Sequence, residues 1–141
     1  MGFTAWDEPS MSTGVVSVDA QHRLLIDMLN QFILSAANGE GKQKLGEMLE
    51  FLRAYAIKHF SHEEKIMDEH RCPAAQRNKI AHASFLREFT ALAAKVQRDG
   101  PSLGMVLDVQ HKVLDWLTAH IQNCDARLRK CALVQEGSVW K

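Results

Sequence analysis

Residues 58–64 read Lys-His-Phe-Ser-His-Glu-Glu, and the two side chains that organise the chain are His59 and Glu63 within this stretch. Four residues of an α-helix complete one turn and advance about 40° beyond it, so an imidazole and a carboxylate at this spacing share a face. Together they can supply two ligands to one metal ion. A histidine and a glutamate four residues apart are also common on solvated helices, so the interpretation depends on how the rest of the chain is arranged.

Apolar residues recur at alternating steps of three and four along four stretches of the chain, which predicts four amphipathic helices. The stretches begin near Val18, Leu45, Asn78 and Leu103, and the last ends near Leu133. Segments rich in glycine or proline separate them, and proline cannot continue a helix interior. No stretch alternates with the period of a β-strand.

The predicted fold is therefore all-α, an up-down-up-down antiparallel four-helix bundle. The bundle is predicted over residues 18–133, with residues 1–17 as an extended N-terminal arm. Residues 134–141 are interpreted as a C-terminal tail or the start of a linker.

Each predicted helix carries one histidine on its apolar face: His22, His59, His82 and His120. In an antiparallel bundle with tight turns, residues at one level are symmetric about each turn. The midpoints between successive histidines fall near residue 40, near residues 70–71 and at residue 101, all in or beside predicted turns. The four imidazoles are therefore expected in one layer.

Glu63, Asn78 and Asp125 lie within about one helical turn of this layer. A single histidine on an apolar face is usually a hydrogen-bonded core residue, but burying four of them with two carboxylates is costly unless partners are supplied. A metal would supply them. Imidazole and carboxylate without thiolate suit iron, manganese or zinc, and two carboxylates able to bridge indicate a pair of ions.

Two related metal motifs are absent. Ile66 occupies the position of the second histidine of a zincin HExxH motif that would begin at His62, and no Glu-x-x-His typical of ferritin-like di-iron bundles occurs.

Composition excludes several classes of protein. The chain has 17 basic and 17 acidic residues without a basic run, which argues against nucleic-acid binding. No apolar run reaches the roughly 18 residues of a membrane span, and the N-terminus lacks a signal-peptide layout, so a cytoplasmic protein is expected. The three cysteines, Cys72, Cys124 and Cys131, form no CxxC pair. They are interpreted as small buried residues in a reducing compartment, without disulfides.

The segments 18–22, 59–64, 82–86 and 116–125 resemble, in this order, the motifs of bacterial hemerythrins. The resemblance implies two non-haem irons joined by an oxo or hydroxo group and bridged by Glu63 and Asp125. It implies that His22 and His59 bind the iron that takes O₂, and that the remaining histidines, His82 and His120, bind the other. The residues that match the family's apolar O₂ pocket, which are otherwise plain core, are Leu25, Phe60, Trp116, Leu117 and Ile121.

The chain departs from the family at one ligand position. Hemerythrins usually have His-x-x-x-His on the third helix, whereas here the first of the two positions is Asn78. An amide oxygen is a weak iron ligand, so Asn78 is expected to bind poorly or to leave a water or a vacant position. An exchangeable position on both irons should speed autoxidation; the competing interpretation is a damaged site with one metal or none.

These observations favour an oxygen- or redox-sensing module with an autoxidising di-iron site, which in a longer protein would be joined to a C-terminal signalling domain such as a diguanylate cyclase. The alternatives are an enzyme that reduces peroxide, NO or O₂, and a stand-alone O₂ carrier. Whether the chain is an enzyme stays open. Glu64 and Tyr55 are the nearby candidates for acid–base chemistry, and they are more simply a surface charge and a core aromatic.

Overall fold

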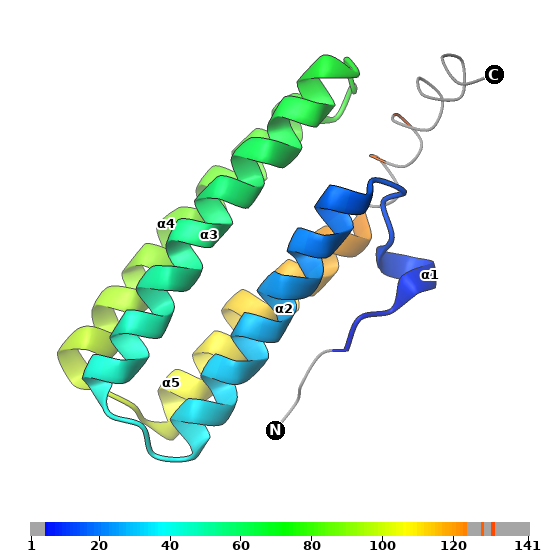
Figure 1. The fold of residues 1–141 in the computed structure, drawn as a ribbon. Coiled ribbons are helices and arrows are strands. Elements are labelled where there is room, and N and C mark those ends of the chain that lie inside the picture. The colour runs from blue at the N-terminus through cyan, green and yellow to red at the C-terminus, as the bar shows by residue number, and fades with distance from the viewer. Residues whose placement is uncertain (1–4, 124–127, 129–130, 132–141) are drawn as a thin grey trace.

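The protein is an all-helical bundle (Figure 1), as the periodicity predicts; the computed structural model describes residues 5–123 together with 128 and 131. The helices are α1 (Glu8–Met11), α2 (Val16–Ala37), α3 (Lys42–Glu69), α4 (Ala75–Asp99) and α5 (Leu103–Asp108). The last helix continues through a π-helical segment, Val109–Leu114, and returns to α-helix over residues 115–123.

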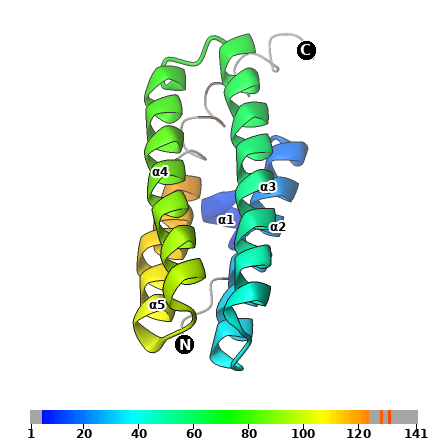
Figure 2. The same cartoon turned by 90° about the vertical axis from the view of Figure 1, so that its left-hand side faces the viewer.

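The long helices close into a ring of neighbours. Helix α2 packs against α3, α3 against α4, α4 against the π-helical segment, and α5 with that segment packs back onto α2 (Figures 1 and 2). Gly39 and Gly100 lie in the turns that end α2 and α4, with φ of +87° and +76°, a conformation that glycine adopts without steric cost. Ser102 starts α5 by accepting a hydrogen bond from the Met105 N–H (3.0 Å).

The core has two apolar parts with polar side chains between them. The larger part fills the half of the bundle toward the turns at residues 38–41 and 100–102, and Phe32 and Phe89 are among its largest fully buried members. A smaller cluster lies beyond the histidines and contains Val18, Met67, Cys72 and Leu128. The buried polar side chains of the layer are therefore closed off by apolar residues on both sides.

The N-terminal arm differs from the prediction in two respects. It contains a one-turn helix, α1, and α2 begins at Val16 rather than Val18. The carboxylate of Asp19, in the first turn of α2, accepts hydrogen bonds from the N–H and hydroxyl of Thr13 (2.8 and 2.7 Å) and from the Ser12 hydroxyl (3.0 Å). Asp19 therefore ties the arm to the first helix.

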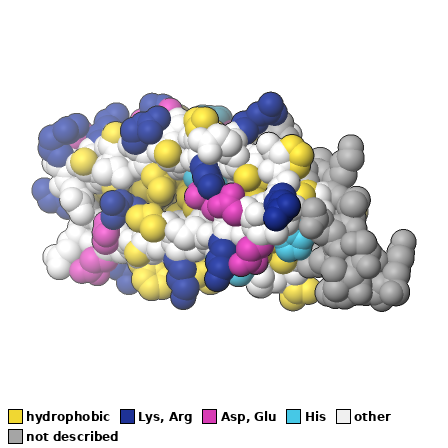
Figure 3. Space-filling model, turned by 90° about the horizontal axis from the view of Figure 1, so that it is seen from above, with side chains coloured by type: hydrophobic (Ala, Val, Ile, Leu, Met, Phe, Trp, Pro, Cys, Tyr) yellow, Lys and Arg dark blue, Asp and Glu magenta, His cyan; other side chains and the backbone are white. Residues whose placement is uncertain are grey.

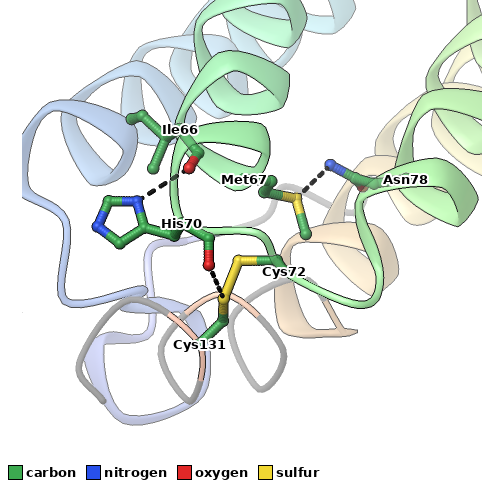
Figure 4. The surroundings of a disulfide bond; sticks show 6 residues. All are labelled: Ile66, Met67, His70, Cys72, Asn78 and Cys131. Carbon is green, nitrogen blue, oxygen red and sulfur yellow. Dashed lines mark hydrogen bonds between the residues drawn. A yellow bond between two sulfur atoms is a disulfide. The ribbon is translucent and has the colours of Figure 1, made fainter. Parts of the chain in front are cut away.

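The prediction of no disulfide is wrong. Cys72 and Cys131, 59 residues apart in sequence, are joined by a disulfide with a Cα–Cα distance of 5.6 Å (Figure 4). The cause is topological: the α3–α4 turn and the end of the last helix lie at the same end of an up-down bundle. An odd number of cysteines thus does not argue against one pair, and the inference of a reducing compartment loses its basis. Cys124 lies outside the described residues.

The face of the molecule in Figure 3 is mixed in charge. On the face in Figure 3, Lys and Arg side chains lie beside Asp and Glu, in keeping with the 17 basic and 17 acidic residues of the chain. Among the residues described, no helix combines the length and the apolar character needed to cross a membrane.

Candidate metal centre

The Glu63 carboxylate lies at the centre of the polar layer, with none of its surface exposed. Its Oε2 lies 3.0 Å from Nε2 of His22 and 3.4 Å from Nε2 of His59. Its Oε1 lies 3.1 Å from Nε2 of His82 and 3.9 Å from Nε2 of His120. Each carboxylate oxygen thus faces one pair of imidazoles, which is the arrangement of a carboxylate that bridges two ions.

Four different segments deliver these groups. His59 and Glu63 come from α3, one turn apart, whereas His22 comes from α2, His82 from α4 and His120 from the helix over residues 115–123. The structure therefore brings together in one layer the four histidines that the sequence placed there. Asp125, the second predicted bridging carboxylate, lies outside the described residues.

The outer nitrogens of two imidazoles are held by hydrogen bonds. His59 Nδ1 lies 2.7 Å from Oε1 of Gln21, and His82 Nδ1 lies 2.8 Å from Oε2 of Glu64. Because both acceptors are oxygens, Nδ1 donates the hydrogen bond in each case. In the neutral form of such a ring, Nε2 is a lone pair, and here it faces Glu63.

This orientation is the test of whether the residues fit a metal. Nε2 of His59 is buried and has no hydrogen-bond partner, although it faces the Glu63 carboxylate. A lone pair and a carboxylate oxygen that face each other in an apolar core both require a positive partner. Metal ions between Glu63 and the imidazoles would satisfy them, and two overlapping groups of three donors share Glu63: one with His22 and His59, the other with His82 and His120.

The protonation states agree with metal binding. Burial lowers the pKa of His59 to about 4, against the opposing effect of Glu63, and burial also lowers the pKa of His120. Burial alone would raise the pKa of Glu63, but the surrounding histidines together hold it well below its usual range. At neutral pH, His59 and His120 are therefore neutral and Glu63 is ionised, which are the forms that bind metal.

Asn78 lies at the edge of this layer and is buried. Its Nδ2 donates to Oε1 of Glu63 (2.7 Å) and contacts Sδ of Met67 (3.1 Å; Figure 4). The amide thus presents its nitrogen, not its oxygen, to the carboxylate. The interpretation of Asn78 as a weak ligand or a vacant position stays a prediction.

Aromatic rings cover the second pair of histidines. Phe60 stacks on His82 with ring centroids 3.9 Å apart, and Trp116 stacks on His120 at 4.7 Å. The other residues matched to the family's O₂ pocket are buried: Leu25, Leu117 and Ile121. Their role as a ligand pocket stays a prediction, whereas their packing shields the layer from water.

Comparison with known proteins agrees with this geometry. A family model described as the hemerythrin HHE cation binding domain matches residues 13–131, most of the chain. The chain belongs to the hemerythrin family. A bacteriohemerythrin of Methylococcus capsulatus is 28% identical over 138 residues, covering 93% of this chain and 98% of that protein. A bacteriohemerythrin of Pseudomonas paraeruginosa is 27% identical over 126 residues, covering 89% of this chain and 79% of that protein.

Solved hemerythrins share the fold. The crystal structure of a mutant hemerythrin superposes with a TM-score of 0.79 at 25% identity, over 93% of this chain and 98% of that chain. A wild-type hemerythrin structure superposes with a TM-score of 0.73 at 21% identity, over 91% of this chain and 99% of that chain. The described part of this chain thus has the hemerythrin fold.

Two residues beside the candidate ligands make contacts that the sequence does not predict. Glu64 is not simply a surface charge, because its carboxylate accepts the hydrogen bond from His82. Gln21 lies in the hemerythrin-like segment 18–22, but no role was assigned to it. Each lies next to a predicted ligand, His22 or Glu63, and that adjacency was the available signal.

Proposed function

We propose that this hemerythrin domain holds two non-haem irons with an oxo or hydroxo bridge and binds O₂. His22 and His59 would hold the first iron, and His82 and His120 the second. Glu63, together with Asp125, would bridge them. The observation that supports this most directly is the Glu63 carboxylate, whose two oxygens each face one pair of imidazoles. When bound, such a centre supplies up to two electrons to O₂.

The residues around the ligands would protect this chemistry. Gln21 and Glu64 hold the rings of His59 and His82 so that Nε2 points inward. Phe60 and Trp116 cover the second pair of imidazoles with apolar surface. Excluding water from the site slows the loss of reactive species to solvent.

Asn78 favours sensing over stable O₂ carriage. It stands where hemerythrins usually supply a third imidazole to the second iron, and its amide nitrogen faces Glu63. A second iron without that ligand has an exchangeable position, which should speed autoxidation. We therefore propose an oxygen- or redox-responsive module. In a longer protein, a C-terminal signalling domain would convert the state of the di-iron site into an output signal.

A stand-alone O₂ carrier is the second candidate. The bacteriohemerythrin of Methylococcus capsulatus is matched over 98% of its own length, so a protein of about this size exists in the family. Enzymatic reduction of peroxide or NO has less support, since Glu64, the candidate acid–base group beside the ligands, has an orienting role as the acceptor of the His82 Nδ1 hydrogen bond.

Replacing Asn78 by histidine tests the choice between sensor and carrier. The Asn78→His variant restores the usual imidazole, which closes the exchangeable position, and we expect its O₂-dependent visible spectrum to persist longer than that of the wild type. Equal autoxidation rates in two fully iron-loaded proteins would refute the role of Asn78 and favour the carrier. Gln76→His, an exposed change in the same turn of α4, is the matched control.

A further inference from the structure

The two halves of the site differ in the group that holds the outer nitrogen of the imidazole. In the first half, the acceptor for His59 Nδ1 is the neutral amide of Gln21, at 2.7 Å. In the second half, the acceptor for His82 Nδ1 is the carboxylate of Glu64, at 2.8 Å. The Glu63 carboxylate contacts the imidazoles of both halves, so its charge does not distinguish them. The charge of the Glu64 carboxylate, against the neutral Gln21 amide, does.

The two acceptors occupy equivalent places in the bundle. Gln21 directly precedes His22 on α2 and reaches His59 on α3, whereas Glu64 directly follows Glu63 on α3 and reaches His82 on α4. Each acceptor therefore lies beside one ligand in sequence and binds a ligand of the next helix. The arrangement orients the rings in both halves but places a negative charge in the second half alone.

A carboxylate acceptor does more than orient an imidazole. When a carboxylate accepts the Nδ1–H hydrogen bond, it gives the ring partial imidazolate character. This makes Nε2 a stronger electron-pair donor to a metal. An amide oxygen accepts the same hydrogen bond without adding charge. The Glu64 side chain is 27% exposed, so water screens part of its charge but leaves the contact with His82, itself 2% exposed, intact.

The charged acceptor, Glu64, lies in the second half of the site, where Asn78 replaces the third imidazole of the hemerythrin pattern. Asn78 and Glu64 both serve the second pair: the Asn78 amide contacts Oε1 of Glu63, the oxygen that faces His82. A metal held there by His82, His120 and Glu63 has one strong donor fewer than the hemerythrin pattern provides. Added charge on His82 is the kind of change that offsets this loss.

We propose that Glu64 is a positioning residue whose carboxylate, through His82, strengthens the second metal position and so offsets the absence of a third imidazole at Asn78. The inference rests on the proposed di-metal function. It also implies that the two metal positions differ in reduction potential. The Glu64 charge would stabilise the more oxidised state of the metal held through His82 relative to the metal held through His59.

Substitutions at Glu64 separate charge from orientation. Glu64→Gln keeps an oxygen acceptor of the same shape and removes the charge, whereas Glu64→Ala removes both. Glu69→Gln removes a carboxylate from the exposed surface of the same helix and is the matched control. The probe is Zn²⁺ titrated calorimetrically into metal-free protein, which reports both positions without redox chemistry.

For the wild type and Glu69→Gln we expect two Zn²⁺ per chain. For Glu64→Gln we expect one unchanged affinity and one weakened by at least about tenfold, the typical cost of altering a group that holds a ligand. The iron-loaded Glu64→Gln protein should also have a more positive reduction potential for one iron. A Glu64→Gln protein with both affinities and both potentials unchanged overturns the inference and leaves the di-metal function standing. A wild type that takes up fewer than two Zn²⁺ overturns the di-metal function first and the inference with it.

Discussion

Acidification should destabilise the metal-free protein, and the burial of His59 sets the size of the effect. The pKa of His59 falls from 6.5 in the unfolded chain to about 4 in the folded one. Between these values the unfolded chain binds a proton that the folded chain does not, so stability falls as the pH falls through this window. Lowering the pH from about 7.5 to about 5 should cost about 2 kcal/mol through His59 alone. His120, whose pKa is also lowered, adds to the loss in the same direction.

Urea unfolding of the metal-free, disulfide-intact protein, followed by helical circular dichroism at the two pH values, measures this loss. His59→Gln should remove about 2 kcal/mol of the pH dependence, the share computed from its own titration. His111→Gln, at an exposed histidine beside Asp115, is the control and should leave most of it. Glu63 acts in the same direction but only at lower pH, because a carboxylate with a depressed folded pKa loses its stabilising effect as the pH falls below its unfolded value of 4.5. Equal pH dependence in the His59→Gln and His111→Gln variants would refute the reasoning, since the buried layer would then not be the source of the effect.

Two further predictions concern the bundle around the site. Phe89 is a core side chain that is 1% exposed, and Phe89→Ala should lower the free energy of unfolding by about 3–5 kcal/mol in urea titrations. Phe51 is 66% exposed, and the control Phe51→Ala should change this free energy by less than about 0.5 kcal/mol. Similar losses in both variants would contradict the assigned core. The Cys72–Cys131 disulfide joins residues that are 59 apart in sequence. Reducing it should lower the free energy of unfolding by up to about 4 kcal/mol, because the unfolded chain regains conformational entropy. If a Cys131→Ser variant is as stable as the oxidised wild type, and reductant changes the stability of neither protein, the disulfide does not form.

Much of the site was predictable because helical geometry converts sequence spacing into position. The level of His22, His59, His82 and His120 follows from turn midpoints, which tight turns fix to within about a residue. The groups around the ligands were harder to predict. Periodicity identifies which face of α3 points inward, but not which helix lies on each side of that face. The contact of Glu64 with His82 depends on α4 being that neighbour, so sequence spacing alone left Glu64 as a surface charge.

Two other features depend on the assembled fold. The cysteines show no pattern in sequence, and the disulfide requires the end of the last helix to return to the α3–α4 turn (Figure 4). The π-helical segment Val109–Leu114 keeps its apolar residues on the same face as an α-helix would, so the spacing of Val109 and Val113 carries no sign of it.

The central claim is that Glu63 joins two metal positions, and iron content tests it most directly. Protein expressed with iron should contain about two irons per chain by mass spectrometry, and the anaerobically reduced sample should develop the visible spectrum of an oxo-bridged di-ferric centre when air is admitted. Glu63→Gln, which keeps the shape of the side chain but removes the bridging charge, should lose at least one iron and this spectrum. One iron or none in the wild type would contradict the account, and the bundle would then be a hemerythrin scaffold without a di-iron site.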